Sequence, residues 1–428
     1  FLTGCLPNKT GYWEPVEYCQ DTYSTLYDKV NGTYDYQEYA PFYDFTENYR
    51  TAIFDIPAAV LSDKVNGVQV LGWGGHDPFT PSHSNPPELL SELTQQHGED
   101  LVCGKDYGIW WDKAYYDRIR ESLKITISRR KSICCDLLKR EDWDLFITVF
   151  GESHTVEHDL YGFSESEHPL HAFLKKRTSG ANPVLKTFQQ IDQAIGEIIE
   201  TVPEDASIMC FSLHGMGVNH ADMLTMVFLP EFLYRFSFPD KAAIGFHPSG
   251  SEPCPMITNP IRHSWLGEVW ARNYGMSPID RALRPLTPSQ LLAKDHLGLA
   301  CPFPLLAQDS LAWMPSRWYA PSWPNMKAFA LPAFTDGHIR INLKGREAHG
   351  IVDPSDYEDV CHQITAWLHQ IKDTRTGSLV VKQVIRTRHS PFAEDSKLPI
   401  ADLVVVWHAH PTDVVESPLF GQIGPLPY

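Results

Sequence analysis

Apolar residues along this chain follow two alternating patterns. Short apolar runs of strand length alternate with longer stretches in which apolar residues recur about every 3.6 positions, as on one face of a helix. The strand-like runs cover 51–56, 68–73, 144–150, 207–212 and 402–407, and the helical stretches cover 114–140, 187–202 and 360–371. Strands that alternate with helices predict an α/β fold, with a mostly parallel central sheet and helices on both faces.

One long segment breaks this alternation. Between about 236 and 332 the chain is rich in Pro and Trp and has little periodicity. Such a stretch is typical of an insertion packed over a sheet edge. We therefore expect residues 1–428 to form a single domain, with a Pro/Trp-rich cap or insertion at 236–332.

Composition and charge narrow the class of protein. Hydrophobic residues make up 43% of the chain and charged residues 21%, as in ordinary globular proteins. No apolar run reaches the roughly 18 residues that a membrane helix needs. The net charge of −17 argues against a nucleic-acid polymer as partner, whereas a small anionic substrate held by a metal is compatible with it. Nine scattered cysteines without a CxxC pair favour reduced thiols and a cytoplasmic protein.

The first candidate site directly follows the apolar run 144–150. In the sequence GESHTVEH, His154 and His158 stand four residues apart, a spacing that lets two imidazoles on one helical turn share a metal. Glu152 and Glu157 are candidates for a further ligand or for a hydrogen-bond partner of a ligand. Two surface histidines in a polar loop explain this spacing about equally well.

The second candidate site follows the run 207–212. His214 lies in SLHGMGVNH, where Gly215 and Gly217 permit the close backbone approach that a ligand-bearing turn often needs. In open α/β sheets, loops at the carboxyl ends of neighbouring parallel strands converge on one crevice. The sequence therefore predicts that His154, His158 and His214 lie together.

These loops resemble motifs of one known family. SLHGM resembles the Ser-Asp-His-Gly-Met motif of the type I phosphodiesterase/nucleotide pyrophosphatase family, a branch of the alkaline phosphatase superfamily, and GESHTVEH is similar to its Asp-x-x-Gly-His motif. The N-terminal FLTGCLPNKTGYW is similar to the segment that follows the family's Thr or Ser nucleophile. GHIRINLKGREAHGIV and the last dozen residues resemble the distal part of the superfamily's predicted phosphohydrolase/phosphomutase proteins. The resemblance spans nearly the whole chain in order and implies an alkaline-phosphatase-like fold.

The resemblance also implies a metal site, from which this sequence departs in two places. His158 and His214 match the family's metal-binding histidines, but His154 stands where the first motif has Asp, and Leu213 stands where the second motif has Asp. The nucleophile is expected before Phe1 and the last metal-binding His after Tyr428, so both native ends are expected to be missing.

The implied activity is metal-dependent hydrolysis of small phosphodiesters or nucleotide-like phosphate esters through a Ser or Thr nucleophile. One or two divalent ions are expected; a nitrogen-rich set of ligands favours zinc, with manganese or iron as alternatives. Three other functions stay open: a phosphomutase or phosphoryl transferase, a sulfatase-like or phosphonate-cleaving enzyme, and a non-catalytic binding protein with a decayed metal site, which Leu213 favours. The expected partner is a small phosphorylated substrate, with no membrane and no nucleic-acid polymer, and the oligomeric state is open.

A few other polar residues are weaker candidates. A substrate phosphate could be bound by Arg340, Lys344 and Arg346, although a solvated hairpin with Ile339, Ile341 and Leu343 facing inward is the favoured interpretation. Residues near predicted strand ends could line a pocket, but a structural role is favoured for each: Asp55, Asn66 and the turn 72–76.

Overall fold

The computed structural model describes most of the chain as two compact units. It describes residues 1–27, 34–74, 81–102, 113–178, 181–245, 247–259, 264–273, 279, 283, 286, 299–305, 311–393 and 395–428. Unit 1 comprises 1–6 and 30–217, and unit 2 comprises 7–29 and 218–428. The predicted single domain with a cap at 236–332 stays a prediction.

Unit 1 is built on a four-stranded sheet that confirms three of the predicted strands. Its order is β5 (His83–Asn85), β4 (Gly67–Leu71), β3 (Thr51–Phe54) and β6 (Leu145–Thr148). The central strand β3 pairs parallel with both β4 and β6, whereas the edge strand β5 is antiparallel. All four residues of β3 are buried, which explains why this strand is a continuous apolar run rather than an alternating one.

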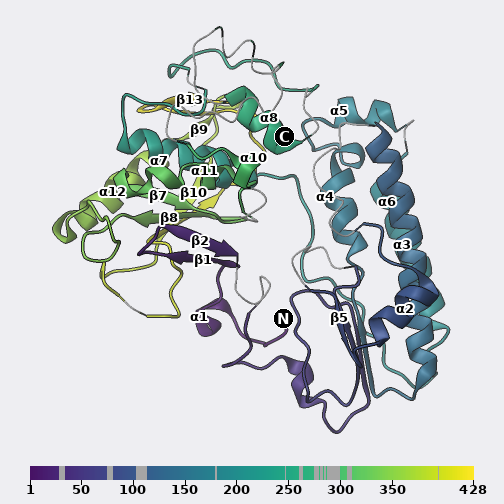
Figure 1. The fold of residues 1–428 in the computed structure, drawn as a ribbon. Coiled ribbons are helices and arrows are strands. Elements are labelled where there is room, and N and C mark those ends of the chain that lie inside the picture. The colour runs from purple at the N-terminus through teal and green to yellow at the C-terminus, as the bar shows by residue number, and fades with distance from the viewer. Residues whose placement is uncertain are drawn as a thin grey trace. The chain divides into compact units, whose positions relative to one another are not determined.

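Helices cover one face of this sheet (Figure 1). They are α2 (Leu89–His97), α3 (Lys113–Arg140) and α6 (Pro183–Ile199), while α4 (Glu152–Ser164) packs against α3 and α6 and the short α5 (His171–Leu174) packs against α4. Residues of α2, α3 and α6 pack with β3 and β4 around Phe54, Leu93, Ile133 and Leu137. The helix α6 begins as its sequence predicts, because the Asn182 side chain accepts a hydrogen bond from the Leu185 N–H and Pro183 follows it. The predicted helices at 114–140 and 187–202 are thus confirmed, with α6 shifted towards the N-terminus.

The opposite face of the sheet corrects the prediction of helices on both faces. There, Ile53 and Leu71 pack against Leu2, Tyr43 and residues 56–65. Within the described part of unit 1, this covering contains irregular chain and one short 3-10 turn, η1 (Phe42–Phe45), instead of α-helices. Apolar side chains from an irregular segment can bury a sheet face as well as a helix does. Because such a segment has no repeating pattern, the apolar periodicity of the sequence does not reveal it.

The predicted strand at 207–212 is wrong. These residues are described and form neither a strand nor a helix, and every residue from 204 to 215 is exposed. Met209 is 83% exposed and Phe211 55%. Apolar composition predicts burial, but a strand also needs a neighbouring backbone to pair with, and no strand described in the structure pairs with this run.

The described strands of unit 2 pair in antiparallel sheets. Its four-stranded sheet has the order β10 (Val381–Arg386), β11 (Leu403–Trp407), β8 (Gly337–Ile341) and β7 (Ala328–Leu331), and each neighbouring pair is antiparallel. A hairpin and a three-stranded sheet complete the described strands: β1 (Val16–Cys19) with β2 (Ser24–Tyr27), and β13 (Gly421–Ile423), β12 (Val415–Ser417) and β9 (Lys372–Asp373). A mostly parallel sheet is therefore found in unit 1 alone, and the chain as a whole is mixed α/β.

The helices of unit 2 are mostly short, and several of them pack around a large aromatic core. They include α1 (Pro7–Thr10), α7 (Leu229–Ser237) after the π-helical turn η3 (Leu224–Phe228), α8 (Trp265–Asn273), α10 (Pro302–Leu305), α11 (Pro315–Trp318) and α12 (Tyr357–Leu368), with 3-10 turns η6 (Ala320–Asn325) and η7 (Pro354–Asp356). The predicted helix at 360–371 corresponds to α12, and the predicted strand at 402–407 to β11. From the Pro- and Trp-rich segment, Trp270, Trp318 and Trp323 are fully buried in this core. In the described part of the chain, no helix has the length and apolar character needed to cross a membrane.

Candidate active site

Two of the predicted metal ligands lie on the first two turns of α4. The helix begins at Glu152, directly after the carboxyl end of β6, and Gly151 at its N-cap has a helical backbone conformation. Because residues four apart share one face of a helix, the imidazoles of His154 and His158 lie side by side, with ring centroids 4.3 Å apart. The rings meet edge to face.

His214 lies beside the same pair. Its ring centroid is 5.6 Å from that of His154, although the 207–212 run that leads to it is not a strand. Glu157, on α4, is close enough to His214 to interact with it electrostatically. Partial burial raises the pKa of the Glu157 carboxyl, and His214 opposes this shift. The structure thus gathers three imidazoles and one carboxylate from two segments of unit 1.

The residue types gathered here are suitable metal ligands, but their present arrangement does not form a metal site. Three imidazoles and a carboxylate are ligands of zinc and of similar divalent ions. Yet within the residues that the structure describes, no group of three or more His, Cys, Asp or Glu side chains is arranged to hold a metal ion. His158 and His214 are both exposed, so packing does not lock their rotamers. Side-chain rotation would be needed to converge the ring nitrogens on one point.

Glu152 has a different partner from the one the sequence suggests. Its side chain is buried, and both carboxylate oxygens accept hydrogen bonds from Nε of Arg130, at 2.8 and 2.9 Å. Burial raises the pKa of the Glu152 carboxyl, against the opposing effect of Arg130. Both carboxylate oxygens of Glu152 are therefore held by α3 rather than facing the histidines.

Arg130 also holds the end of β3. Its second guanidinium nitrogen, NH2, donates to Oδ2 of Asp55 at 2.7 Å. The Asp55 carboxylate accepts two backbone N–H groups as well, from Trp73 at 2.9 Å and from Gly74 at 3.1 Å. Asp55, a weak pocket candidate from the sequence, is thus part of a buried ionic network; the turn 72–76 supplies these two donors, and its residues 75 and 76 lie outside the described part.

Sequence reasoning missed Arg130, although a signal was present. The apolar face of α3 runs through Ile127, Ile133 and Leu137, and Arg130 falls on this face three residues after Ile127. Its side chain is 0% exposed. A charged residue within an apolar helical stripe predicts a buried ion pair, because an unpaired charge would be too costly there.

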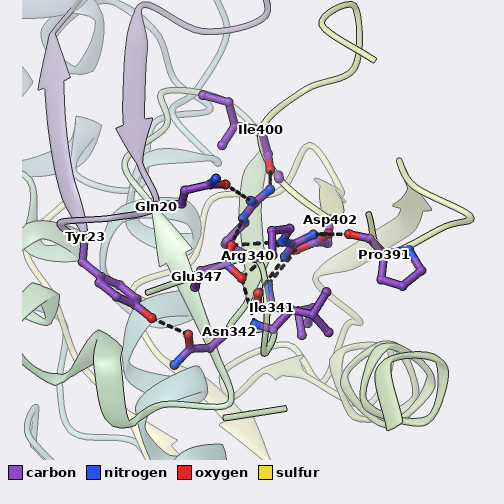
Figure 2. A network of polar contacts seen from close by, with 12 residues as sticks. Gln20, Tyr23, Arg340, Ile341, Asn342, Glu347, Pro391, Ile400 and Asp402 are labelled. Carbon is purple, nitrogen blue, oxygen red and sulfur yellow. Dashed lines mark hydrogen bonds and ion pairs between the residues drawn. The ribbon is translucent and has the colours of Figure 1, made fainter. Parts of the chain in front are cut away.

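The three basic candidates for a substrate phosphate lie in unit 2. Figure 2 shows Arg340 within a polar network, where it donates to Glu347 at 2.7 Å, to the Ile400 carbonyl at 2.6 Å and to Gln20 at 3.5 Å. Arg346 donates to both oxygens of Asp402 at 2.7 Å. Only Lys344 is well exposed, and it pairs with Asp353 at 2.9 Å.

This arrangement corrects the expected solvated hairpin. Every residue of β8 is buried, including Arg340, so both faces of the strand are covered. The geometry gives no support to a phosphate-binding role for Arg340 and Arg346, and that role stays a prediction. Asn66, another weak candidate, accepts a hydrogen bond from Arg50 at 2.9 Å.

Comparison with known proteins decides the family. The sequence model of the type I phosphodiesterase/nucleotide pyrophosphatase family matches residues 23–252, more than half of the chain. The chain belongs to this family. No curated protein and no solved structure matches it.

Membership places the chain among hydrolases that act on phosphoric esters, within the alkaline phosphatase superfamily. The family is typically dependent on divalent metals. The matched range contains His154, His158 and His214, together with Arg130, Asp55 and Glu152. Arg340, Lys344 and Arg346 lie outside it.

The resemblance set Leu213 against the Asp of the family's second motif. In the structure Leu213 is 65% exposed, next to His214 in the chain. Because its side chain is in solvent, it does not serve as a core residue. The departure at Leu213 therefore removes a candidate ligand without adding a packing contact.

Proposed function

We propose that this protein hydrolyses small phosphodiesters or nucleotide-like phosphate esters with a divalent metal bound by His154, His158 and His214. The observation that carries the proposal is the gathering of these three imidazoles at the carboxyl end of β6, in a chain that belongs to a phosphodiesterase family. Zinc is the proposed metal because three nitrogen ligands suit a borderline ion, with manganese or iron as alternatives.

The proposed roles follow from the chemistry of phosphoryl transfer. A bound divalent cation would neutralise charge that develops on the phosphoryl oxygens. The histidines would hold that cation, and Glu157 would orient His214 through the interaction between their side chains. Attack by a Ser or Thr nucleophile is part of the proposal, as the resemblance implies.

The charge of the chain supports a small substrate. A net charge of −17 repels an extended polyanion, and a protein that binds nucleic acid through its phosphates needs a basic surface. A single phosphate ester at a metal site needs only local positive charge, which the metal supplies. We therefore expect turnover of nitrophenyl phosphodiesters and dinucleotides in preference to long single or double strands.

The test uses the full-length protein and a panel of esters. Nitrophenyl phosphate monoesters and diesters, nitrophenyl sulfate and dinucleotides are each assayed with zinc, manganese or iron. His158→Ala should weaken zinc binding at least about tenfold and abolish turnover, because it removes a direct ligand. The matched control is His362→Ala, which removes an exposed histidine from α12 in unit 2. Hydrolysis of the sulfate ester alone, or full activity in His158→Ala, would overturn the proposal.

The second candidate function is a protein that binds a metal but does not catalyse a reaction, and Leu213 favours it. Leu213 lacks the carboxylate of the family motif, which weakens any second metal site. Since Leu213 is exposed, Leu213→Asp should change the free energy of unfolding by no more than about 0.5 kcal/mol. A gain of metal stoichiometry together with a gain of turnover supports the enzyme; a gain of metal alone supports the rival.

A further inference from the structure

The buried guanidinium of Arg130 and its partner Asp55 join three parts of unit 1: the start of α4, the end of β3 and the turn after β4. The guanidinium bonds Glu152 on the first turn of α4 and Asp55 at the end of β3. Asp55 in turn binds the backbone of the turn after β4. Rings from the ends of β3, β4 and β6 lie against the guanidinium, with its carbon 5.1 to 5.9 Å from the centroids of Phe54, Trp73 and Phe150.

We infer that Arg130 is a positioning residue for the metal-binding histidines: it fixes the start of α4 through Glu152 and thereby places His154 and His158. The inference rests on the proposed function in one respect, namely that His154 and His158 are metal ligands. It assigns no contact between Arg130 and the metal or the substrate.

The geometry of the guanidinium makes this placement rigid. The group is planar, and its N–H groups point in fixed directions within one plane. With Nε on Glu152 and NH2 on Asp55, the distance and angle between the two carboxylates are set by one rigid group. A lysine at this position would be a single flexible point charge and would fix neither.

Because His154 and His158 lie on the same helix as Glu152, fixing Glu152 also fixes their positions. An α-helix rises 1.5 Å and turns about 100° per residue, so a helix that is held at Glu152 has its next turns placed as well. His154 is two residues further on, and its backbone N–H bonds the Gly151 carbonyl at 3.1 Å. His158 lies one turn beyond His154 on the same face.

The energetics favour positioning over stabilisation as the reason for an arginine here. Buried ion pairs are weak evidence for stability, because well-packed apolar side chains of similar volume often serve as well or better. Among the described residues, Arg130 NH1 is also buried without a hydrogen-bond partner, which is unfavourable. The turn also leaves no room for a side chain at Gly74, since a Cβ there would lie 2.5 Å from Asp100 Oδ2 and 3.0 Å from Arg130 NH2.

The experiment compares Arg130→Met with a control of similar cost in the same helix. Leu137→Ala removes a fully buried side chain from α3 without touching the network. Each full-length variant is measured for thermal unfolding without added metal, for zinc affinity by competition titration, and for hydrogen exchange of the amides at 152–158. We expect Arg130→Met to lose at least about tenfold in zinc affinity and to lose exchange protection in that segment. Leu137→Ala should keep both within about twofold of the parent protein.

A double variant covers the case in which the single variant does not fold. Arg130→Met with Glu152→Met replaces the ion pair by two apolar side chains, which should restore stability. The inference requires that this stable protein still binds zinc at least about tenfold more weakly. Zinc affinity equal to that of the parent protein would overturn it.

Hydrogen exchange separates this inference from the proposed function. If the parent protein binds none of the three metals, the proposed function fails, but the exchange data still decide whether Arg130 anchors α4. Protection at 152–158 that is the same in Arg130→Met and Leu137→Ala would overturn the inference even if the parent protein is an active zinc hydrolase.

Discussion

Each unit of this protein contains an arginine between two carboxylates, and the two networks differ in how many of the arginine's nitrogens have hydrogen-bond partners. In unit 2, every guanidinium nitrogen of Arg346 donates a hydrogen bond: the Nε atom to Glu347, and NH1 and NH2 to Asp402 and to backbone carbonyls. In unit 1, Arg130 donates through Nε and NH2, while NH1 has no hydrogen-bond partner in the described part of the chain.

One carboxylate of each network, Glu152 in unit 1 and Asp402 in unit 2, has a shifted pKa, and the two shifts have opposite directions. Burial acts to raise the pKa of Asp402, but the hydrogen bonds and charge of Arg346, the charge of Arg340 and the Ile341 N–H together outweigh it and hold the pKa below its usual range. Asp402 also accepts bonds from the Tyr357 hydroxyl and the Ile341 N–H, both at 2.8 Å. For Glu152, burial outweighs the pull of Arg130, and the pKa is raised. The unit 2 network therefore stabilises the charge of Asp402. In unit 1 the charge of Glu152 stays destabilised by burial, and a role in positioning α4 is a reason to keep the network despite this cost.

The largest expected effect comes from breaking the complete network. Arg346→Met leaves the carboxylate of Asp402, which is 0% exposed, without its two-point partner. Loss of one partner of a buried pair costs about 3–5 kcal/mol, because the remaining charge is desolvated and uncompensated. Urea unfolding followed by far-UV circular dichroism should show this loss, and it should exceed that of Arg130→Met. A smaller loss than in Arg130→Met would reverse the comparison.

An intermediate effect on stability is expected from two ionisable side chains of unit 2 that lie outside the arginine network, His338 and Glu14. Burial lowers the pKa of His338 to about 4. Between its ordinary value near 6.5 and about 4, the unfolded chain binds more protons at His338 than the folded chain, so stability falls as the pH falls through this window. A shift of this size corresponds to roughly 3 kcal/mol at most.

Glu14, whose carboxylate is 3.9 Å from His338, has the opposite sign. Burial raises its pKa to about 7, so the folded chain binds more protons between about 4.5 and 7 and stability falls as the pH rises. His338→Asn and Glu14→Gln should therefore change the slope of stability against pH in opposite directions. Urea midpoints measured from pH 4.5 to 7 provide the check, and slope changes of the same sign would contradict the assignment.

The smallest effect is expected for the exposed ion pair at the border of the unit 2 network. Lys344 and Asp353 are each about half exposed, and water and salt screen their attraction. Lys344→Ala should cost less than about 1 kcal/mol, and the cost should shrink further in 0.5 M salt. The same variant tests the predicted phosphate contact, since a clear rise in KM for a nitrophenyl phosphodiester would argue for that role.

The sequence by itself determined the local elements and the sites where chemistry was expected. Apolar periodicity depends on neighbours along the chain, so it located β3, β4, β6, α3, α6 and α12 to within a few residues. The spacing of His154 and His158 predicted that their rings share a helix face, because helix geometry is local. Motif order pointed to the family that the comparison then confirmed.

Only the tertiary structure decided which polar side chains face one another. Glu152 and Glu157 look equivalent in the sequence, yet Glu152 binds Arg130, 22 residues before it, while Glu157 lies near His214. The run at 207–212 has the composition of a buried strand and is exposed, because strand formation depends on a partner that composition does not specify. The sequence suggested that Arg340 and Arg346 are solvated cations, yet Arg340 is buried and most of the Arg346 side chain is covered, since their carboxylate partners are Glu347 and Asp402. Partner choice is a property of packing between distant segments, and no local pattern encodes it.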